Sequence, residues 1–187
     1  TRGWTVRGRA DDTPLREGLE ARLWALEGSF GSREVVRDGA MLTLAEIIRS
    51  GTTCFADKYF FPDEVAKVAN EASVRAQLAS PVLDFPTVWA QDADDYISKT
   101  TQLHDDYRSS ELVSIAFGPH APYTVSDKPL QRIAALAEEL DVPIHIHMHE
   151  NAREVSDALA SDGRRPLASR ADLGLVSPRL LGGHASQ

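Results

Sequence analysis

Residues 143–150 read Pro-Ile-His-Ile-His-Met-His-Glu and contain three of the six histidines in the chain. A β-strand alternates its side chains between two faces, so we expect histidines on one face and apolar residues on the other. The first face would carry His145, His147 and His149, and the second Ile144, Ile146 and Met148. This pattern suits a strand of a parallel barrel, whose outer face packs under helices and whose inner face points towards an active site.

The three histidines have an ordinary interpretation and a functional one. A buried imidazole bonded to a backbone carbonyl is more common than a metal ligand. Each buried histidine nevertheless costs about 1 to 3 kcal/mol unless it is paired, so three on one face favour at least one bound partner. Neutral imidazole is a common zinc ligand, and a carboxylate beside a metal site, here Glu150, can carry protons to and from a substrate.

The composition limits the class of protein. With 187 residues, of which 42% are hydrophobic and 26% charged, the chain can build one substantial core. We therefore expect a single domain over residues 1–187. The formal net charge of −8 argues against nucleic acid or an anionic membrane as a partner, because phosphate groups are bound by basic surfaces.

The cysteine content and the chain ends bear on the cellular setting. The single cysteine, Cys54, lies in an apolar run and cannot form an internal disulfide, so we expect a buried thiol and a reducing compartment. No apolar run reaches the roughly 18 residues that cross a bilayer, and a cytoplasmic location is expected. The chain begins at Thr1 without methionine and stops at Gln187 after an apolar run, so we expect both ends to be truncations.

Apolar runs alternate with helical patterns along the chain. One helix is expected to begin at Pro62 and to carry apolar residues as far as Ala76. Strands are expected at residues 52–57, 81–85, 112–118, 143–150 and 179–185. Such alternation implies a parallel α/β sheet, either a doubly wound open sheet or part of a (β/α)8 barrel of the TIM type. The chain has no Gly-x-Gly-x-x-Gly motif after a strand, which counts against the open nucleotide-binding sheet.

Residues that can carry chemistry gather where these strands end. Asp57 ends the first strand and His120 follows the third, while Glu150 ends the fourth and His184 the fifth. In a parallel barrel the carboxyl ends of the strands form one rim, which holds the active site. The sequence therefore predicts a site at that rim.

Five sequence blocks, in order, resemble one family across the whole chain. The blocks are Arg-Gly-Arg-Ala-Asp-Asp-Thr-Pro-Leu (7–15), Gly-Thr-Thr-Cys-Phe-Ala-Asp (51–57), Gly-Pro-His-Ala-Pro-Tyr-Thr-Val-Ser (118–126), His-Met-His-Glu (147–150) and Gly-Gly-His-Ala-Ser-Gln (182–187). Together they resemble the amidohydrolase superfamily, and within it the deaminases of methylthioadenosine and S-adenosylhomocysteine and the triazine hydrolases. The resemblance implies a metal-dependent hydrolase built on a (β/α)8 barrel.

The resemblance also implies a role for individual residues. His147 corresponds to a metal ligand on the fifth barrel strand, and Glu150 to the catalytic glutamate three residues later. His184 corresponds to a histidine that contacts the metal-bound hydroxide. His120 and Glu27 correspond to substrate-binding residues, the latter contacting the sugar of a nucleoside.

Two of the family's metal-binding blocks have no counterpart in the chain. The His-x-His of the first barrel strand would fall before Thr1, and the aspartate of the eighth strand would fall after Gln187. The resemblance therefore implies a partial barrel of about five parallel strands with intervening helices. Such a chain, taken alone, is expected to be inactive, to hold its metal weakly and to form a homo-oligomer through its unpaired edges.

The resemblance implies hydrolytic deamination of an adenine-type nucleoside by a metal-activated water. Methylthioadenosine, S-adenosylhomocysteine and adenosine are the expected substrates, and one divalent metal is the expected cofactor, zinc in the first place and iron as the alternative. Two other interpretations remain open. One is an amino- or chlorohydrolase that acts on a triazine or a related heteroaromatic ring. The other is a truncated, non-catalytic half-barrel that self-associates.

Overall fold

The computed structural model describes residues 31–187, in which strands and helices alternate. The elements in chain order are α4 (Arg33–Arg49), β1 (Cys54–Lys58), α5 (Pro62–Glu71), β2 (Arg75–Val82), α6 (Ala93–Tyr107), β3 (Val113–Pro119), α7 (Asp127–Leu140), β4 (Ile144–Met148), α8 (Ala152–Asp162), α9 (Pro166–Ala171) and β5 (Leu180–His184). Glu27 and the sequence block at residues 7–15 lie outside the described residues.

The five strands form one parallel sheet in the order β1-β2-β3-β4-β5. Helices make every crossover, as the alternating pattern predicted, and each strand lies beside its predecessor in the sequence, an order that the pattern left open. In this register His147 of β4 lies opposite Gly183 of β5. All five carboxyl ends therefore meet at one edge of the sheet.

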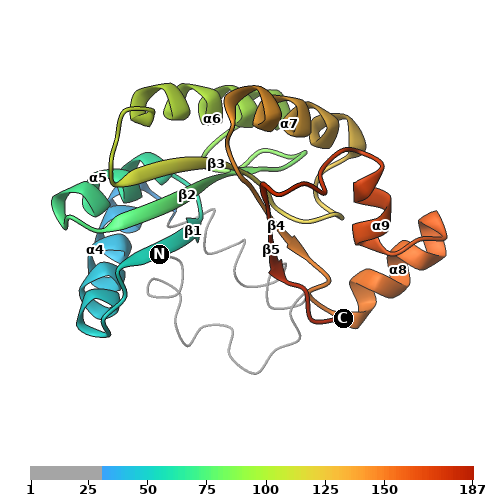
Figure 1. Cartoon of the computed structure of the whole chain (residues 1–187), viewed down its shortest axis with the longest axis horizontal. Helices are drawn as coiled ribbons and strands as arrows, with labels where there is room; N and C mark the ends of the chain where they lie inside the picture. The colour runs from blue at the N-terminus through green and yellow to red at the C-terminus, as the bar shows by residue number, and fades with distance from the viewer. Residues whose placement is uncertain (1–30) are drawn as a thin grey trace.

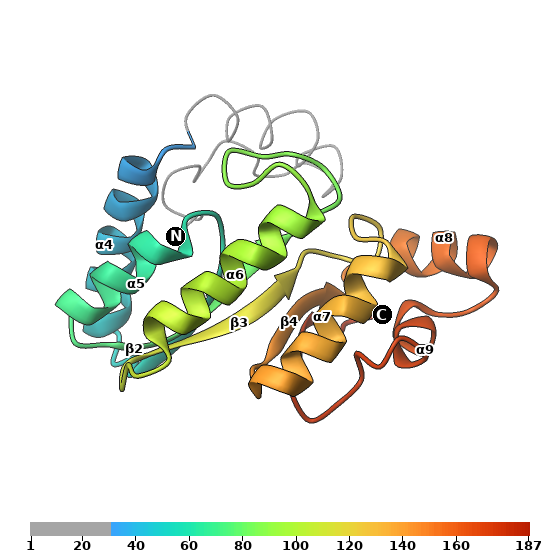
Figure 2. The ribbon, with the colours of Figure 1, turned by 90° about the horizontal axis from the view of Figure 1, so that it is seen from above.

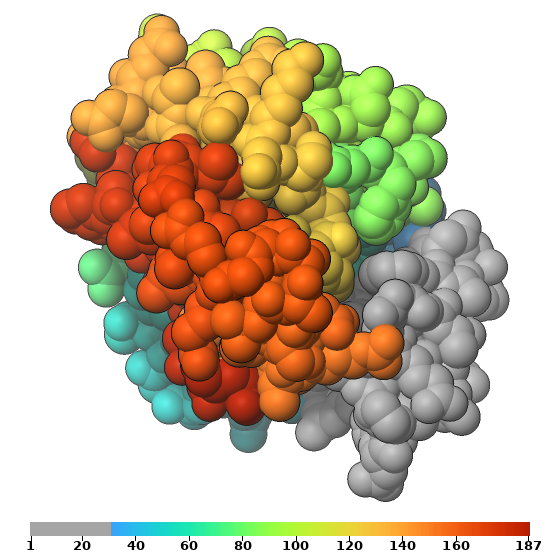
Figure 3. All heavy atoms as spheres, turned by 90° about the vertical axis from the view of Figure 1, so that its right-hand side faces the viewer, coloured from blue at the N-terminus to red at the C-terminus, as the bar shows by residue number. Residues whose placement is uncertain are grey.

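Helices α6 and α7 lie side by side over one face of the sheet (Figures 1 and 2). Helices α8 and α9 form the centre of the molecular face seen in Figure 3. Helix starts follow local capping chemistry, since the Ser32 side chain accepts a hydrogen bond from the backbone N–H of Val35, and Asp92 caps α6 in the same way. Within residues 31–187 no helix is long and apolar enough to cross a membrane.

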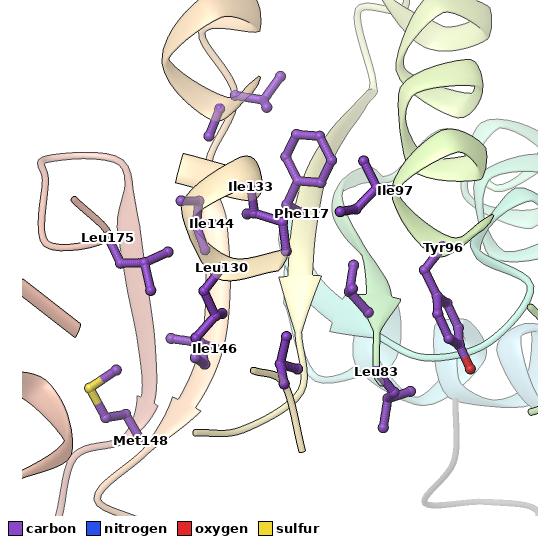
Figure 4. Packing of buried hydrophobic residues seen from close by; sticks show 14 of the residues in the cluster. Leu83, Tyr96, Ile97, Phe117, Leu130, Ile133, Ile144, Ile146, Met148 and Leu175 are labelled. Carbon is purple, nitrogen blue, oxygen red and sulfur yellow. The ribbon is translucent and has the colours of Figure 1, made fainter. Parts of the chain in front are cut away.

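The main core lies between β3, β4 and the helices above them (Figure 4). Ile144, Ile146 and Met148 of β4 are buried there against Leu130 and Ile133 of α7. These three apolar side chains occupy the face that the period-two pattern predicted. The opposite face of β4 is thereby left to His145 and His147, which are only partly buried.

The start of the second strand was predicted wrongly. The sequence pattern continued the helix after Pro62 as far as Ala76 and began the strand at residue 81. In the structure α5 ends at Glu71 and β2 begins at Arg75. Ser73 adopts a left-handed conformation (φ 54°) that stops the helix. The alanines that follow fit a helical and an extended pattern equally well, so their spacing could not locate this boundary.

Cys54 is exposed, which contradicts the buried thiol expected from its apolar neighbours. It lies on β1, which has a strand on one side only within the described sheet. The next residue, Phe55, packs against the apolar cluster beneath α4 and α5. Alternation along the strand therefore turns Cys54 to the face opposite the helices.

Candidate active site

Three predicted histidines come together at the carboxyl edge of the sheet. His147 lies on β4, His120 directly follows β3, and His184 ends β5. The ring centroid of His147 is 5.6 Å from that of His120 and 4.9 Å from that of His184. The backbone N–H of His147 also donates to the carbonyl of His120 over 3.1 Å. Neighbouring parallel strands thus place residues far apart in sequence at one point.

Glu150 joins this group through His184. Oε1 of Glu150 lies 3.1 Å from Nε2 of His184, and the Glu150 side chain is only 13% exposed. The pair connects the loop after β4 with the end of β5. Of the five residues that the sequence singled out, four are therefore close together, and the fifth, Glu27, lies outside the described residues.

His149 does not share the face of His145 and His147, so the prediction of three histidines on one face was wrong. β4 ends at Met148, and His149 has a left-handed backbone with φ 55°. Its Nδ1 lies 3.1 Å from the carbonyl of Gln187, and its Nε2 accepts a hydrogen bond from the Leu167 N–H over 3.3 Å. A histidine whose two ring nitrogens are used in this way links the end of β4 to helix α9 and to the segment that follows β5.

The two remaining strand histidines are electrically neutral at physiological pH. Burial, supplemented by the positive charge of Lys58, lowers the pKa of His145 to about 4 and that of His147 to about 2. The buried Nδ1 atoms of both rings have no hydrogen-bond partner among the described residues. A neutral imidazole with a free ring nitrogen is the form that coordinates a metal ion.

These residues fit one part of a metal centre. Within residues 31–187, no three side chains of histidine, cysteine, aspartate or glutamate are grouped so that they could hold a metal ion. A zinc centre ordinarily needs three or four protein ligands. The described residues therefore supply only part of a ligand set, namely the neutral rings of His145 and His147 beside the carboxylate and imidazole pair of Glu150 and His184.

Close contact with β5 fixes the ring of His147. A Cβ atom added at Gly183 would lie 2.9 Å from Nδ1 of His147, closer than real Cβ contacts allow, whereas one at Gly182 would meet nothing within 4 Å. We expect Gly183→Ala to lower the free energy of unfolding by about 1 to 3 kcal/mol and to shift the ring resonances of His147. Gly182→Ala should do neither. Urea unfolding and NMR of the two variants measure this, and equal effects would contradict the contact.

Lys58 is a residue of the site that the sequence patterns did not identify. Its Nζ atom donates a hydrogen bond of 3.1 Å to the carbonyl of His120, the same carbonyl that accepts from His147. Burial lowers the pKa of Lys58 to about 7, although the charge of Glu150 acts in the opposite direction. The available signal was its position, since it follows Asp57 at the end of a strand that leads into the predicted rim.

The lowered pKa of Lys58 predicts how stability depends on pH. The unfolded chain binds this proton up to about pH 10.5 and the folded chain only up to about 7, so the free energy of unfolding should rise with pH between these values. The slope would approach about 1.4 kcal/mol per pH unit. Urea unfolding from about pH 7 to about pH 9.5 measures it.

The substitution Lys58→Met tests the source of this pH dependence. Methionine has similar length and no charge, so the rise of stability with pH should largely disappear. Lys128→Met removes an exposed lysine on α7 and is the matched control. If Lys58→Met kept the slope of the parent chain, the buried ammonium group would not be its cause.

Comparison with known proteins supports the same family as the sequence blocks. Residues 9–182 match the amidohydrolase family. A 5-methylthioadenosine/S-adenosylhomocysteine deaminase of Saccharophagus degradans is 57% identical over 172 residues, which are 92% of this chain and 39% of that protein.

Solved structures agree on the architecture. A zinc-bound adenosine deaminase of Xanthomonas campestris superposes with a TM-score of 0.96 and 44% identity, over 100% of this chain and 42% of that one. The five parallel strands therefore form a half-barrel that matches part of an amidohydrolase TIM barrel, as predicted. An atrazine chlorohydrolase of Arthrobacter aurescens, 20% identical with a TM-score of 0.85, covers 98% of this chain and 46% of its own, and shows the shared fold alone.

The chain spans about two fifths of the length of these relatives. The family match extends over most of the chain, and it includes four of the five sequence blocks in full or nearly so. The chain therefore belongs to the amidohydrolase family.

Proposed function

We propose that this chain forms the catalytic rim of a hydrolase that deaminates an adenine-type nucleoside. The pairing of Glu150 with His184 at 3.1 Å, beside the neutral ring of His147, carries the proposal. A partly buried carboxylate in such surroundings can deliver a proton and take one back during hydrolysis. The names of the Saccharophagus degradans and Xanthomonas campestris relatives support an adenine nucleoside as substrate.

In this proposal Glu150 moves the proton. Glu150 takes a proton from the attacking water and passes it to the adjacent ring nitrogen, while the water oxygen adds to the ring carbon that carries the amino group. Ammonia then leaves with a proton that passes through the same carboxylate. The imidazole of His184 keeps the Glu150 carboxylate in place and, when protonated, stabilises negative charge that develops beside it. His120, which follows β3, would contact the substrate, and Glu27 would bind the sugar.

A divalent metal is part of the proposal, and zinc is the first candidate because the Xanthomonas campestris relative binds it. Zinc supplies Lewis acidity that makes water nucleophilic at neutral pH. His147 would be one of its ligands. Since residues 31–187 contain no group of three suitable side chains, the remaining ligands would come from other residues.

The test uses a barrel chimera, defined as the Saccharophagus degradans relative with its matching segment replaced by this chain. We expect the barrel chimera to bind zinc and to release ammonia from methylthioadenosine, S-adenosylhomocysteine or adenosine at a rate within about tenfold of the parent enzyme. The chain alone, as a control, should release none, and its sedimentation would show whether it self-associates. A preference for a triazine would overturn the substrate class. A zinc-loaded chimera without activity would overturn the function.

A further inference from the structure

We infer that Glu154 is a positioning residue that turns Glu150 towards the site. Glu154 lies in the first turn of α8 and is buried, with 8% of its surface exposed. Its Oε1 accepts a hydrogen bond of 2.8 Å from the N–H of His149, and its Oε2 accepts one of 3.0 Å from the N–H of Glu150. One carboxylate thus holds the two peptide units that join β4 to its loop.

The direction of Glu150 depends on this turn. Along a continuous strand, residue 150 would fall on the same face as Ile146 and Met148, which is the face packed under the helices. The left-handed backbone of His149 (φ 55°) breaks the alternation. Glu150 is thereby brought to the side of His147, where it meets His184 at 3.1 Å.

A left-handed conformation is unfavourable for a histidine and must be held by its surroundings. The carbonyl of His149 accepts hydrogen bonds from the N–H and the hydroxyl of Ser186, over 3.1 and 3.3 Å. The carboxylate of Glu154 accepts a hydrogen bond from the N–H of the same residue, His149. The turn is therefore fixed from both sides, and Glu154 also reaches the amide of the next residue.

Ordinary helix capping does not account for these contacts. In a capping box the acidic residue at the third helical position bonds back to the amide of the N-cap residue. Here Asn151 is the N-cap, and its side chain accepts from the N–H of Glu154 over 2.9 Å. The carboxylate of Glu154 passes the N-cap and binds the two residues before it. Its geometry therefore serves the turn before α8 as well as the helix start.

Glu154→Gln tests the inference because an amide has one acceptor oxygen and would set its NH2 group against a backbone N–H. In the chain itself, we expect the amide protons of His149 or Glu150 to exchange at least about tenfold faster. The ring resonances of His184 should move towards those seen in Glu150→Gln, since both changes take the Glu150 carboxylate away from His184. Glu34→Gln, which removes an exposed carboxylate from the first turn of α4, is the control and should do neither.

In the barrel chimera, Glu154→Gln should lower kcat about 100-fold through misplacement of Glu150, with KM and zinc content changed little. The kcat measurement rests on the proposed function. The exchange and resonance measurements need no substrate, so their outcome does not depend on whether the proposed function is correct. If Glu154→Gln did not fold, Glu154→Asp, with its shorter carboxylate, would carry the same measurements. Unchanged His184 resonances, or faster exchange with an unchanged kcat, would overturn the positioning role.

Discussion

Replacement of Glu150 by glutamine in the barrel chimera is expected to reduce kcat about 10² to 10⁴-fold and to leave zinc content unchanged. Glutamine keeps the shape of the side chain and can still contact His184, but it cannot carry a proton at neutral pH. The loss should fall on kcat, because Glu150 acts on the ring nitrogen during the reaction and not on the sugar.

The measurement combines steady-state ammonia release with metal analysis of the same preparations. Glu139→Gln, which changes an exposed glutamate on α7, is the matched control and should behave as the parent. Full turnover by a Glu150→Gln protein with normal zinc content would remove Glu150 from the mechanism. A loss of zinc together with turnover would make it a metal ligand instead.

Replacement of His147 by alanine should lower the zinc affinity of the barrel chimera by more than about 100-fold, which exceeds the loss typical of residues outside the ligand set. His147 combines a neutral ring, a ring nitrogen without a partner among the described residues, and a position next to His184. Competition with a coloured chelator would measure the affinity.

The neighbouring histidines are the controls for this experiment. His149→Ala should leave zinc affinity within about tenfold of the parent, because its ring nitrogens contact Leu167 and Gln187. His145→Ala should also have a smaller effect than His147→Ala. The ring centroid of His145 lies 6.2 Å from that of His147, and His145 is two residues further from Glu150 along β4. Equal losses for His147 and His149 would show that the two act as a ligand pair and that the assignment of His147 alone is wrong.

Regular patterns in the sequence predicted the regular parts of the structure. Alternation along residues 143–148 placed Ile144 and Ile146 in the core and His145 and His147 opposite, because a strand has only two faces. The parallel sheet with helical crossovers followed from the alternation of strands and helices, and the meeting of His120, His147 and His184 followed from the parallel arrangement. These predictions needed no knowledge of any single side-chain contact.

The parts that were missed depend on local conformation or on long-range contacts. Position 149 is left-handed but holds a histidine, and glycine is the usual sequence signal of a left-handed position. The turn that redirects Glu150 could therefore not be predicted from the sequence. The bond from Lys58 to the His120 carbonyl joins residues 62 positions apart, a distance that spacing rules do not cover. The function of Glu154 had a partial signal, because Asn151 and Glu154 have the spacing of a capping box, yet its reach to His149 appeared only in three dimensions.

One face of β4 packs in the core and the other carries the histidines of the site, and this division has an evolutionary consequence. A substitution at Ile144, Ile146 or Met148 alters packing and therefore threatens the whole fold. A substitution at His145 or His147 changes the chemistry above the sheet and leaves that packing in place. Substitutions at alternate residues of this one short strand can therefore change the activity while the packed residues that stabilise the fold stay the same. This is one way in which a single architecture comes to act on many substrates.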